Sequence, residues 1–462
     1  MGISRRRLLA GAGIGAAGVA AAVLIGPGSE VAKGRSRARV IKTIAKPPAS
    51  ADVVIIGGGN IGTAAALFLA EAGLSVVLCE KGAVAGEASG RSVGHVFSLG
   101  MEPDQLAITN LAKQIWPQVN ALTGQESGFR QNGLLMQIAG EEDRHFWEHW
   151  IKDAGSLSPG ARLLDGREAA KLAATEPSWF GAIYDPTDGS AEPPLVAPAL
   201  ALGAVARGAT IVAPCAVRTV ETEGGAVSGV VTEHGPIRTR NVVLAGGAWS
   251  TAFLQNLGYR LPVGNLFSWC ASFYGVEGPA TNGIFENTTW RRQIDGGFTT
   301  SLMEASAPVT PQSFRYLREM LSAMEVANAG WKVRPRLGAY FFEELMAPGS
   351  WRADEVSPFE KRRILEPEIN MRIVERALTK MRANVPAFRN LKVGSAWGGV
   401  LSSTADTKPV LSPISKVPGL VIATGFSEGL TMAPAAGKLV AELVLGVKPS
   451  IDLRKFAYER FA

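Results

Sequence analysis

Residues 51–81, ADVVIIGGGNIGTAAALFLAEAGLSVVLCEK, decide the fold of this chain. The apolar, β-branched run Val53–Ile56 is too short for a helix and predicts a buried parallel strand. The small residues of Thr63–Ala72 predict a helix that ends at the following glycine, and Leu74–Leu78 predicts a second strand. Glu80 stands just past that strand, where it can accept hydrogen bonds from an adenosine ribose. The order of elements is that of a dinucleotide-binding βαβ unit.

Three glycines between the first strand and the helix have the G-x-G-x-x-G spacing of a phosphate-binding turn. Gly57 permits the tight turn, Gly59 lets the backbone approach a pyrophosphate, and Gly62 lets helix and strand pack closely. The helix N-terminus around Asn60 and Ile61 offers N–H groups and a positive dipole to the phosphates. A glycine-rich turn without a ligand is the alternative.

The charge of the chain is concentrated at its N-terminus. The 462 residues, 47% hydrophobic and 19% charged, are enough for two to three globular domains with large cores. Residues 1–47 hold nine Lys or Arg and one acid, which is a net charge of +8. The whole chain has a net charge of +6, so the remaining residues are slightly negative. The body is therefore not basic, and we expect no nucleic-acid-binding surface on it.

Cysteine and histidine spacing favours neither a disulfide framework nor a metal site. Cys79, Cys215 and Cys270 have no CxxC spacing, which favours buried thiols. His145 and His149 lie four residues apart and could share a helix face, but the HExxH order and an obvious third ligand are missing. We therefore expect a solvated helix face and no metal.

The first 30 residues resemble a twin-arginine export signal. SRRRLL at residues 4–9 places paired arginines before the apolar run Leu8–Ile25, which is marginally long enough to span a bilayer. The small residues Ala20–Ala22 leave cleavage open, but we favour a retained anchor with the body on the exported, periplasmic or extracellular, side. Residues 31–50 would then form a basic linker close to lipid headgroups.

A second motif, GEASGRSVG at Gly86–Gly94, resembles a loop of the D-amino-acid oxidase superfamily of FAD-dependent amine oxidoreductases. Further segments resemble that superfamily in the expected order: the crossing segment 181–220, AGGAWS at 245–250, and the C-terminal stretches 396–409 and 419–437. The resemblance implies FAD as cofactor. Besides the βαβ unit, the residues it implies as FAD contacts are Lys81, Ala88, Ser89, Arg91, Ser92, Val217, Ala245, Gly246, Trp249, Gly398, Gly429, Leu430 and Thr431.

The same resemblance implies an α/β fold, α+β overall, in which a Rossmann-like FAD-binding domain alternates along the chain with a discontinuous antiparallel-sheet substrate domain. The FAD-binding domain would comprise residues 51–100, 181–262 and 390–462. The substrate domain would comprise residues 101–180 and 263–389. Within the latter, Asp295-Gly296 predicts a β-hairpin turn, and a helical insertion is expected at about 311–385. Its aromatic-rich segment GAYFFEELMAPGSW could face lipid or pack on the sheet.

Over nearly its full length the chain is similar to bacterial membrane-bound L-amino-acid deaminases. Such enzymes oxidise an amino acid to its imino acid, which water converts to a 2-oxo acid and ammonia, and they pass electrons to a respiratory quinone or cytochrome. Three pocket positions depart from the family: Met303 replaces a carboxylate-binding arginine, Gly100 a glutamine, and Glu428 a tryptophan. An arginine fork is the strong way to hold a carboxylate. Arg291 and Arg292 on the neighbouring strand could still supply such a clamp.

Three further side chains are candidates for catalysis. Glu428, on the loop expected at the flavin edge, could hold an ammonium group or relay its proton; a salt-bridged or solvated Glu428 is the alternative. His95 could lie near the flavin or serve packing. Glu304 is a weaker candidate because strand alternation turns it away from the face of Met303.

These features favour a membrane-anchored FAD-dependent oxidoreductase that deaminates an amino acid. The alternative is an FAD-dependent oxidase or dehydrogenase of an amine or N-alkyl substrate that lacks the carboxylate. A flavin-bound scaffold without turnover is a third interpretation, which no feature requires. A nicotinamide-only dehydrogenase would leave the flavin-type loop and the C-terminal segments without a role.

Overall fold

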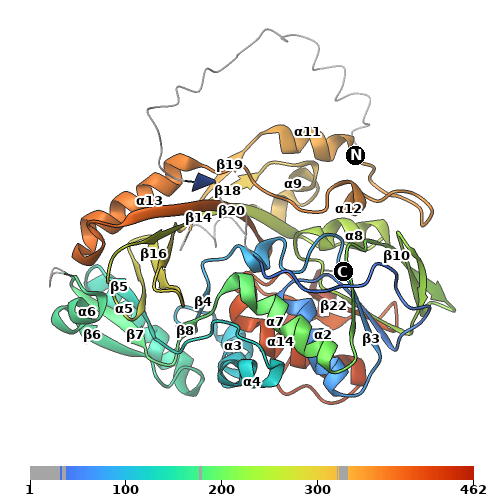
Figure 1. Cartoon of the computed structure of the whole chain (residues 1–462), viewed down its shortest axis with the longest axis horizontal. Helices are drawn as coiled ribbons and strands as arrows, with labels where there is room; N and C mark the ends of the chain where they lie inside the picture. Colours follow the sequence, from blue (N-terminus) through green and yellow to red (C-terminus); the bar gives the residue numbers. More distant parts are fainter. Residues whose placement is uncertain (1–31, 34–37, 176–178, 320, 322–330, 462) are drawn as a thin grey trace, which may run out of the picture. The chain divides into compact units, whose positions relative to one another are not determined.

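The computed structural model of the chain describes residues 32–33, 38–175, 179–319, 321 and 331–461. Within them, a six-stranded sheet and an 11-stranded sheet carry the architecture, and Figure 1 shows the helices packed around both.

The predicted βαβ unit opens the six-stranded sheet, whose order is β21-β22-β13-β2-β3-β9. Strand β2 spans Val53–Ile56, as predicted, and pairs in parallel with β3 and β13. Helix α2 begins at Asn60 and strand β3 at Val76, each within a few residues of the prediction. The other bounds are Val76–Cys79 (β3), Thr210–Val212 (β9), Asn241–Leu244 (β13), Val410–Pro413 (β21) and Leu420–Thr424 (β22).

Three helices lie together on one face of this sheet: α2 (Asn60–Glu71), α7 (Pro193–Ala206) and α14 (Gly429–Leu445). Small residues allow their close approach. A Cβ on Gly437 of α14 would overlap Ala64 of α2, so glycine at this position sets how closely the two helices can pack.

The other face of the sheet is covered by a three-stranded meander, β10 (Val217–Glu223), β11 (Ala226–Thr232) and β12 (Gly235–Arg238). The next strand along the chain does not extend this meander but enters the six-stranded sheet as β13. Its apolar residues are buried on both sides, which is the environment of a central parallel strand.

The 11-stranded sheet forms the substrate side, in the order β1-β20-β14-β17-β16-β15-β5-β7-β6, with β18 and β19 branching from β14. The predicted hairpin is confirmed: β16 and β17 pair antiparallel across Asp295-Gly296. The bounds are Ala32–Lys33 (β1), Leu134–Ile138 (β5), Arg162–Asp165 (β6), Gly181–Asp185 (β7), Val263–Tyr274 (β14), Asn282–Phe285 (β15), Thr288–Arg292 (β16), Phe298–Leu302 (β17), Glu304–Pro308 (β18), Lys332–Arg336 (β19) and Lys392–Thr404 (β20).

The segment 101–180 contains more strand than its sequence suggests. Strands β5 and β6 lie there, and both pair with β7, so the domain boundary drawn at residue 181 does not follow the sheets. Strand β4 (His95–Val96) pairs with β8 (Gly189–Ser190) in a separate two-stranded sheet. This pairing joins the segment after the EASGRS loop to the segment that follows β7. The helices here are α3 (Pro103–Ile115), α4 (Val119–Thr123), α5 (Glu141–Ala154) and α6 (Gly166–Ala173), and α8 (Ser250–Asn256) follows later.

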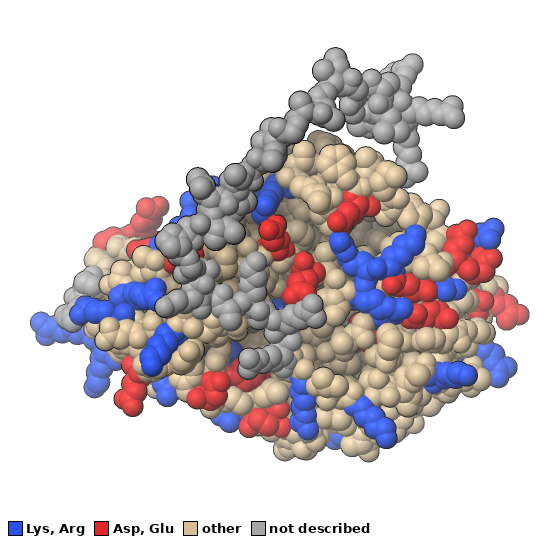
Figure 2. Space-filling model, turned by 45° about the horizontal axis from the view of Figure 1, so that its top comes forward, with Lys and Arg blue, Asp and Glu red and all other residues tan. Residues whose placement is uncertain are grey.

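The expected insertion divides into a packed part and an exposed part. Helix α13 (Met371–Asn384) buries one face on the large sheet. Helix α11 (Ala339–Met346) has no buried residue. Figure 2 shows a broad uncharged area in the upper part of the visible face. The exposed large apolar residues of the described part of the insertion are Phe314, Leu317, Leu321, Leu337, Phe342, Leu345, Met346, Val356 and Ile364, and its short helices are α9 (Pro311–Arg315) and α12 (Pro358–Lys361).

The described part of the expected linker is bound to the body. Arg39 donates its backbone N–H to the Pro194 carbonyl, and Ile44 forms a parallel bridge with Val212 at the edge of the six-stranded sheet. Residues 38–50 therefore lie along the FAD-binding sheet. The apolar run Leu8–Ile25 lies outside the described residues, and no helix among the described residues is long and apolar enough to cross a membrane.

The predictions of buried thiols and of an exposed histidine pair are confirmed, and the expectation of no metal stays a prediction. Cys79, Cys215 and Cys270 are buried free thiols. His145 and His149 lie on exposed positions of α5, and His149 Nδ1 contacts the His145 carbonyl oxygen at 2.7 Å. The described part of the chain contains no cluster of metal-ligating side chains.

Candidate active site

A single cavity of about 1000 Å³ runs from the βαβ turn to the large sheet. At one end it is lined by the glycine turn after β2 and by residues at the end of β3. Its middle is lined by the EASGRS loop, β20 and the loop before α14, and its far end by strands of the large sheet and helix α5. The cavity thus joins the two parts of the fold that the sequence assigned to cofactor and substrate.

The turn at the first end is built for close backbone approach. Gly57 has φ +114°, and a Cβ there would overlap the Ala245 carbonyl oxygen. A Cβ on Gly62 would overlap the carbonyl oxygen of Gly57. Side chains at these positions would push the turn and α2 apart, so the roles predicted for both glycines have a direct steric basis.

Glu80 is held by the turn that it faces. Its carboxylate accepts hydrogen bonds from the backbone N–H groups of Gly58 and Gly82, both at 2.7 Å. Burial raises the pKa of Glu80. The two contacts fix the carboxylate at the end of β3, where each oxygen keeps a lone pair for a ribose hydroxyl.

Two polar atoms in the middle of the cavity are buried and have no partner in the described structure: Asn60 Oδ1 and Ser92 Oγ. Orphaned buried polar atoms are rare and indicate a missing ligand or water. The neighbouring Ser89 hydroxyl accepts from the Asn60 backbone N–H at 2.8 Å and so closes the turn. These donors and acceptors, with the glycine cradle, fit a dinucleotide such as FAD.

Arg91 and Lys81 line the cavity, but protein groups engage their charges. Arg91 is buried and donates to the carbonyl oxygens of Gly86 and Gly398, both at 3.1 Å, and to Glu366. Lys81 pairs with a glutamate at 3.2 Å and lies over the Trp249 ring, 4.5 Å from its centroid. Both cations therefore shape the loop around the cavity.

The loop before α14 brings the predicted flavin-edge residues into the cavity. Helix α14 begins at Gly429, next to the predicted start at Leu430, and both residues line the cavity. Thr431 lies behind them and donates its hydroxyl to the His95 carbonyl oxygen at 3.3 Å. The first N–H groups of the helix thus point toward the place where the resemblance puts the flavin.

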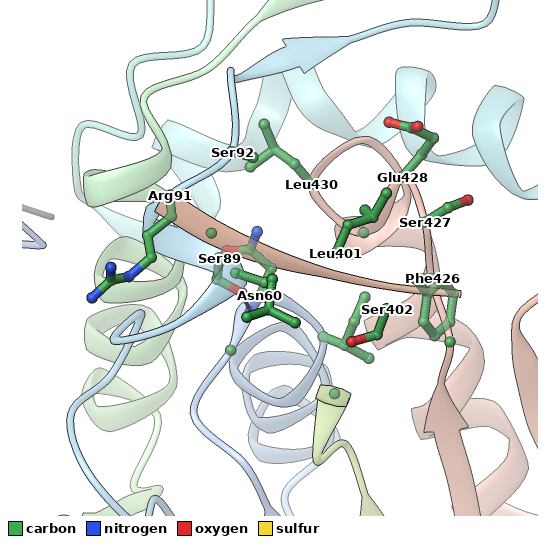
Figure 3. Close-up of a pocket in the computed structure, with 18 of the residues that line it drawn as sticks. Asn60, Ser89, Arg91, Ser92, Leu401, Ser402, Phe426, Ser427, Glu428 and Leu430 are labelled. Atoms are coloured by element: carbon green, nitrogen blue, oxygen red, sulfur yellow. Dashed lines mark hydrogen bonds between the residues drawn. The ribbon is translucent and has the colours of Figure 1, made fainter. Parts of the chain in front are cut away.

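Glu428 is the residue immediately before α14, and its half-buried side chain lines the cavity. Figure 3 shows it beside Ser427 and Leu430, on the opposite side of the view from Arg91. Its carboxylate has no hydrogen-bond or ion-pair partner among the described residues. Burial raises the pKa of Glu428 from 4.5 to about 7.

His95 also lines the cavity, as a neutral side chain. Its Nε2 lies 3.0 Å from the Trp290 carbonyl oxygen. A carbonyl only accepts, so Nε2 carries the proton and Nδ1 remains an acceptor. Burial lowers the pKa of His95 to about 4, which keeps the ring uncharged near neutral pH.

Arg291 and Glu304 are paired with protein groups and do not line the cavity. Both Nη atoms of Arg291 donate to the Glu192 carboxylate, at 2.7 and 3.0 Å, and its side chain is 3% exposed. Glu304 pairs with Arg376, while its neighbour Met303 lines the cavity as strand alternation predicted. The hypothesis that Arg291 replaces the missing carboxylate clamp is therefore corrected, because Glu192 already takes both of its Nη atoms.

Arg292 does not supply the clamp either. Its guanidinium donates to the Gly278 carbonyl oxygen at 3.4 Å and lies over the Phe298 ring. Arg291 and Arg292 are neighbours on β16, so the sequence made both of them candidates for the clamp. Which groups their side chains contact depends on the packing of distant segments.

The remaining predicted cofactor residues divide into those that line the cavity and those that support it. The lining residues are Gly57, Gly59, Asn60, Ile61, Glu80, Ala88, Ser89, Ser92, Val217, Ala245, Gly246 and Trp249. Gly62, Gly398 and Thr431 lie behind this surface and fix the residues in front of them.

The family model described as FAD dependent oxidoreductase (DAO) matches residues 52–443, which is most of the chain. The chain belongs to the DAO family of FAD-dependent oxidoreductases. FAD as the cofactor of this DAO-family chain, an oxidoreductase activity and the mixed α/β FAD-binding fold are thereby confirmed.

Solved structures and curated proteins place the chain among amine and amino-acid oxidoreductases of the DAO family. It is 34% identical to an L-amino acid deaminase from Proteus myxofaciens in complex with anthranilate, with a TM-score of 0.89 over 93% of this chain and 98% of that chain. It is 33% identical to the L-amino acid deaminase from Proteus vulgaris, with a TM-score of 0.86 over 92% and 100%. A glycine oxidase from Bacillus licheniformis is 24% identical over 86% of this chain and 93% of its own length.

The far end of the cavity in this DAO-family chain contains residues that sequence reasoning missed. Met136 of β5 and Ile284 of β15 line it, and these two strands are parallel neighbours in the large sheet. Trp147 of α5 and Trp331 complete an apolar wall. Pairing between strands so far apart in the chain has no local sequence signal, because it depends on the order of strands in the sheet.

The raised pKa of Glu428 predicts a pH-dependent cost in stability. Its folded-state pKa exceeds the unfolded value, so stability that is present below pH 4.5 is lost as the pH rises through about 7. Ionisation in the fold costs up to about 3 kcal/mol, since one pKa unit corresponds to about 1.4 kcal/mol. Glu428→Gln should therefore melt a few degrees above the wild type at pH 8 and close to it at pH 5, measured by calorimetry of the FAD-loaded protein.

A matched control for this measurement is Glu148→Gln, which removes an acid from an exposed position of α5 that pairs with Arg144. It should leave the melting temperature unchanged at both pH values. A Glu428→Gln protein that melts below the wild type at pH 8 would show that the carboxylate is paired in the folded state.

Proposed function

We propose that this chain oxidises the C–N bond of an amino acid or a related amine at the far end of the cavity, and that water then converts the imine to a carbonyl product and ammonia. The observation that carries this proposal is the continuous cavity, which joins the phosphate-binding turn to an apolar wall with the N-terminus of α14 between them. FAD, when bound, would supply the acceptor for the hydride, which carries both electrons of the oxidation.

The residues of the chain bind, orient and exclude water in this proposal. The glycine turn, Glu80 and the orphaned Asn60 and Ser92 oxygens hold the dinucleotide. The apolar wall around Met303 and Trp331 limits water next to the reacting carbon, which protects the imine until it leaves the site. The N–H groups that begin α14 favour negative charge at the edge where reduction places it.

We further propose that the body is exported and held at the membrane, where a quinone or cytochrome takes the electrons. The paired arginines and the apolar run Leu8–Ile25 support this. The exposed apolar side chains of α11, which include Phe342 and Met346, also suit contact with lipid. Part of that segment packs on the body, because the Tyr340 ring contacts Phe267 of β14 and Trp351 is buried, so lipid contact is proposed only for its exposed side chains.

The test is a screen of amino acids and amines against the purified yellow protein without oxygen. At least one compound should bleach the flavin absorbance and release ammonia in equal amount. If the natural electron acceptor is a quinone, adding a soluble quinone should restore the flavin absorbance faster than adding oxygen does. Absence of bleaching with every amino acid and amine would contradict the proposed oxidation.

A further inference from the structure

We propose that Glu428 makes this site select an amine without a carboxylate, so that the substrate enters as a cation and not as an amino-acid zwitterion; this rests on the proposed oxidation of a C–N bond. Three observations carry the inference: the charges that line the cavity, the position of Glu428, and the apolar residues that line the same cavity.

The described lining of the cavity offers no free cation to a carboxylate. Among the described lining residues, Lys81 and Arg91 are the only lysine and arginine, and both lie at the cofactor side. Lys81 is occupied by Glu87 and by the Arg363 carbonyl oxygen at 2.5 Å. Arg91 is occupied by two carbonyl oxygens and an acid. A substrate carboxylate would therefore lose its hydration without gaining a charged partner.

Glu428 adds a negative charge at the place where the substrate would meet the flavin. It directly precedes Gly429 and Leu430, which line the cavity at the N-terminus of α14. Glu80 and Glu87, the acids at the cofactor side, have N–H partners, whereas the Glu428 carboxylate has none in the described structure. An unpaired carboxylate in a cavity is costly unless a ligand provides the cation.

The remaining charged residues at the far end have the same sign. Glu102, Glu142, Asp143 and Glu286 line the cavity and are exposed, and Glu286 is paired with Lys380. Their solvation means that they do not form a binding site by themselves. They do make the approach to the cavity unfavourable for an anion and favourable for a cation.

The position of Glu428 also gives the substrate proton a destination. An ammonium group beside the carboxylate transfers one proton from nitrogen to Oε, so an N–H bond breaks and an O–H bond forms. The products are a neutral amine and a neutral acid, and no electrons move in this step. The raised pKa of Glu428 narrows the gap to the pKa of the amine, which makes this transfer easier than for an ordinary glutamate.

The apolar lining of the same cavity suits the rest of an amine. Met136, Ile284 and Met303 are apolar and come from three neighbouring regions of the large sheet. Met303 occupies the position where the resemblance places a carboxylate-binding arginine. A methionine side chain at that position can bind only a hydrocarbon or aromatic group.

The inference is tested with two matched pairs of probes on the FAD-loaded full chain. L-Phenylalanine and L-phenylalaninamide share ring and amine and differ in the carboxylate; anaerobic flavin reduction measures their turnover. Benzoate and benzylamine share the ring and differ in charge; flavin difference spectra measure their binding without any reaction. Glu428→Gln is compared with wild type, and Glu148→Gln is the control for removal of one acid.

In the wild type, benzylamine should bind more tightly than benzoate, and phenylalaninamide should reduce the flavin at lower concentration than phenylalanine. Glu428→Gln should weaken benzylamine binding roughly 10- to 100-fold, the range for a hydrogen bond to a charged group. The same variant should strengthen benzoate binding, while Glu148→Gln should change neither.

Two results would overturn the inference and leave the proposed oxidation intact: phenylalanine preferred over its amide by the wild type, or an unchanged ratio of benzylamine to benzoate affinity in Glu428→Gln. If no amine or amino acid reduces the flavin but the binding ratio shifts as expected, the proposed oxidation fails while the charge selection by Glu428 stands.

Discussion

Gly62→Ala should give a colourless protein that no longer retains FAD. The added methyl group would overlap the carbonyl oxygen of Gly57, which belongs to the backbone and cannot rotate away, and the Cβ itself is fixed by the backbone of α2. Either α2 moves off β2 or the turn opens, and both displace the N–H groups that face the pyrophosphate. We expect the Kd for FAD to rise roughly 100-fold or more, since overpacking of this kind costs several kcal/mol.

The measurement is the ratio of flavin to protein absorbance after purification, followed by titration of the apoprotein with FAD. Gly140→Ala is a matched control, because Gly140 has an extended backbone and open space around its Cβ position. The control should purify yellow. A yellow Gly62→Ala protein with wild-type affinity would show that α2 and the turn tolerate separation, and the steric role given to Gly62 would be lost.

Arg291→Met should strongly destabilise the fold behind the lining of the cavity. The guanidinium and the Glu192 carboxylate are 3% and 11% exposed, so methionine would leave Glu192 as a buried charge without its cation. Arg291 Nε also donates to the Val93 carbonyl oxygen at 2.5 Å, a contact that methionine cannot replace. Breaking a buried pair on one side costs about 3–5 kcal/mol. We expect the melting temperature to fall by roughly 5 °C or more.

A double-mutant cycle can separate the energy of the Arg291–Glu192 ion pair from the energy of side-chain packing. Adding Glu192→Gln to Arg291→Met removes the unpaired charge and keeps an acceptor for the Ile294 N–H, which Glu192 binds at 2.9 Å. The double variant should recover at least half of the lost melting temperature. Arg292→Met on the same strand is the control and should cost less, because Arg292 has no acidic partner among the described residues and makes a long contact to a carbonyl and a contact to the Phe298 ring. Additive losses in the double variant would argue against a coupled ion pair.

The two substitutions show why cofactor binding was easier to predict than substrate binding. FAD contacts come from backbone brought together by short segments, such as the turn between Val53–Ile56 and α2. Glycine spacing encodes them because sterics act over a few residues. Arg291 looked equally available in the sequence, but its partner Glu192 lies far away in the chain, and no local pattern reports that pairing.

For Glu304 and Met303, the sequence predicted one part of the arrangement and the fold decided the other. Alternation along a strand predicts that they face opposite sides, and the structure agrees, since Met303 lines the cavity and Glu304 does not. The pattern could not say which side was the cavity. That depends on how β18 branches from β14 and on Arg376 of α13, which pairs with Glu304.

The amino-acid sequence by itself determined the βαβ unit, the glycine turn and the hairpin at Asp295-Gly296. These features rest on spacing within short segments, where propensity and sterics decide. The tertiary structure decided which charges remain free: it engaged Arg91 and Arg291 with distant acids and left Glu428 unpaired in the cavity. The physical reason is that an ion pair between distant segments forms only after the sheets have packed, so its energy is a property of the fold and not of any one segment.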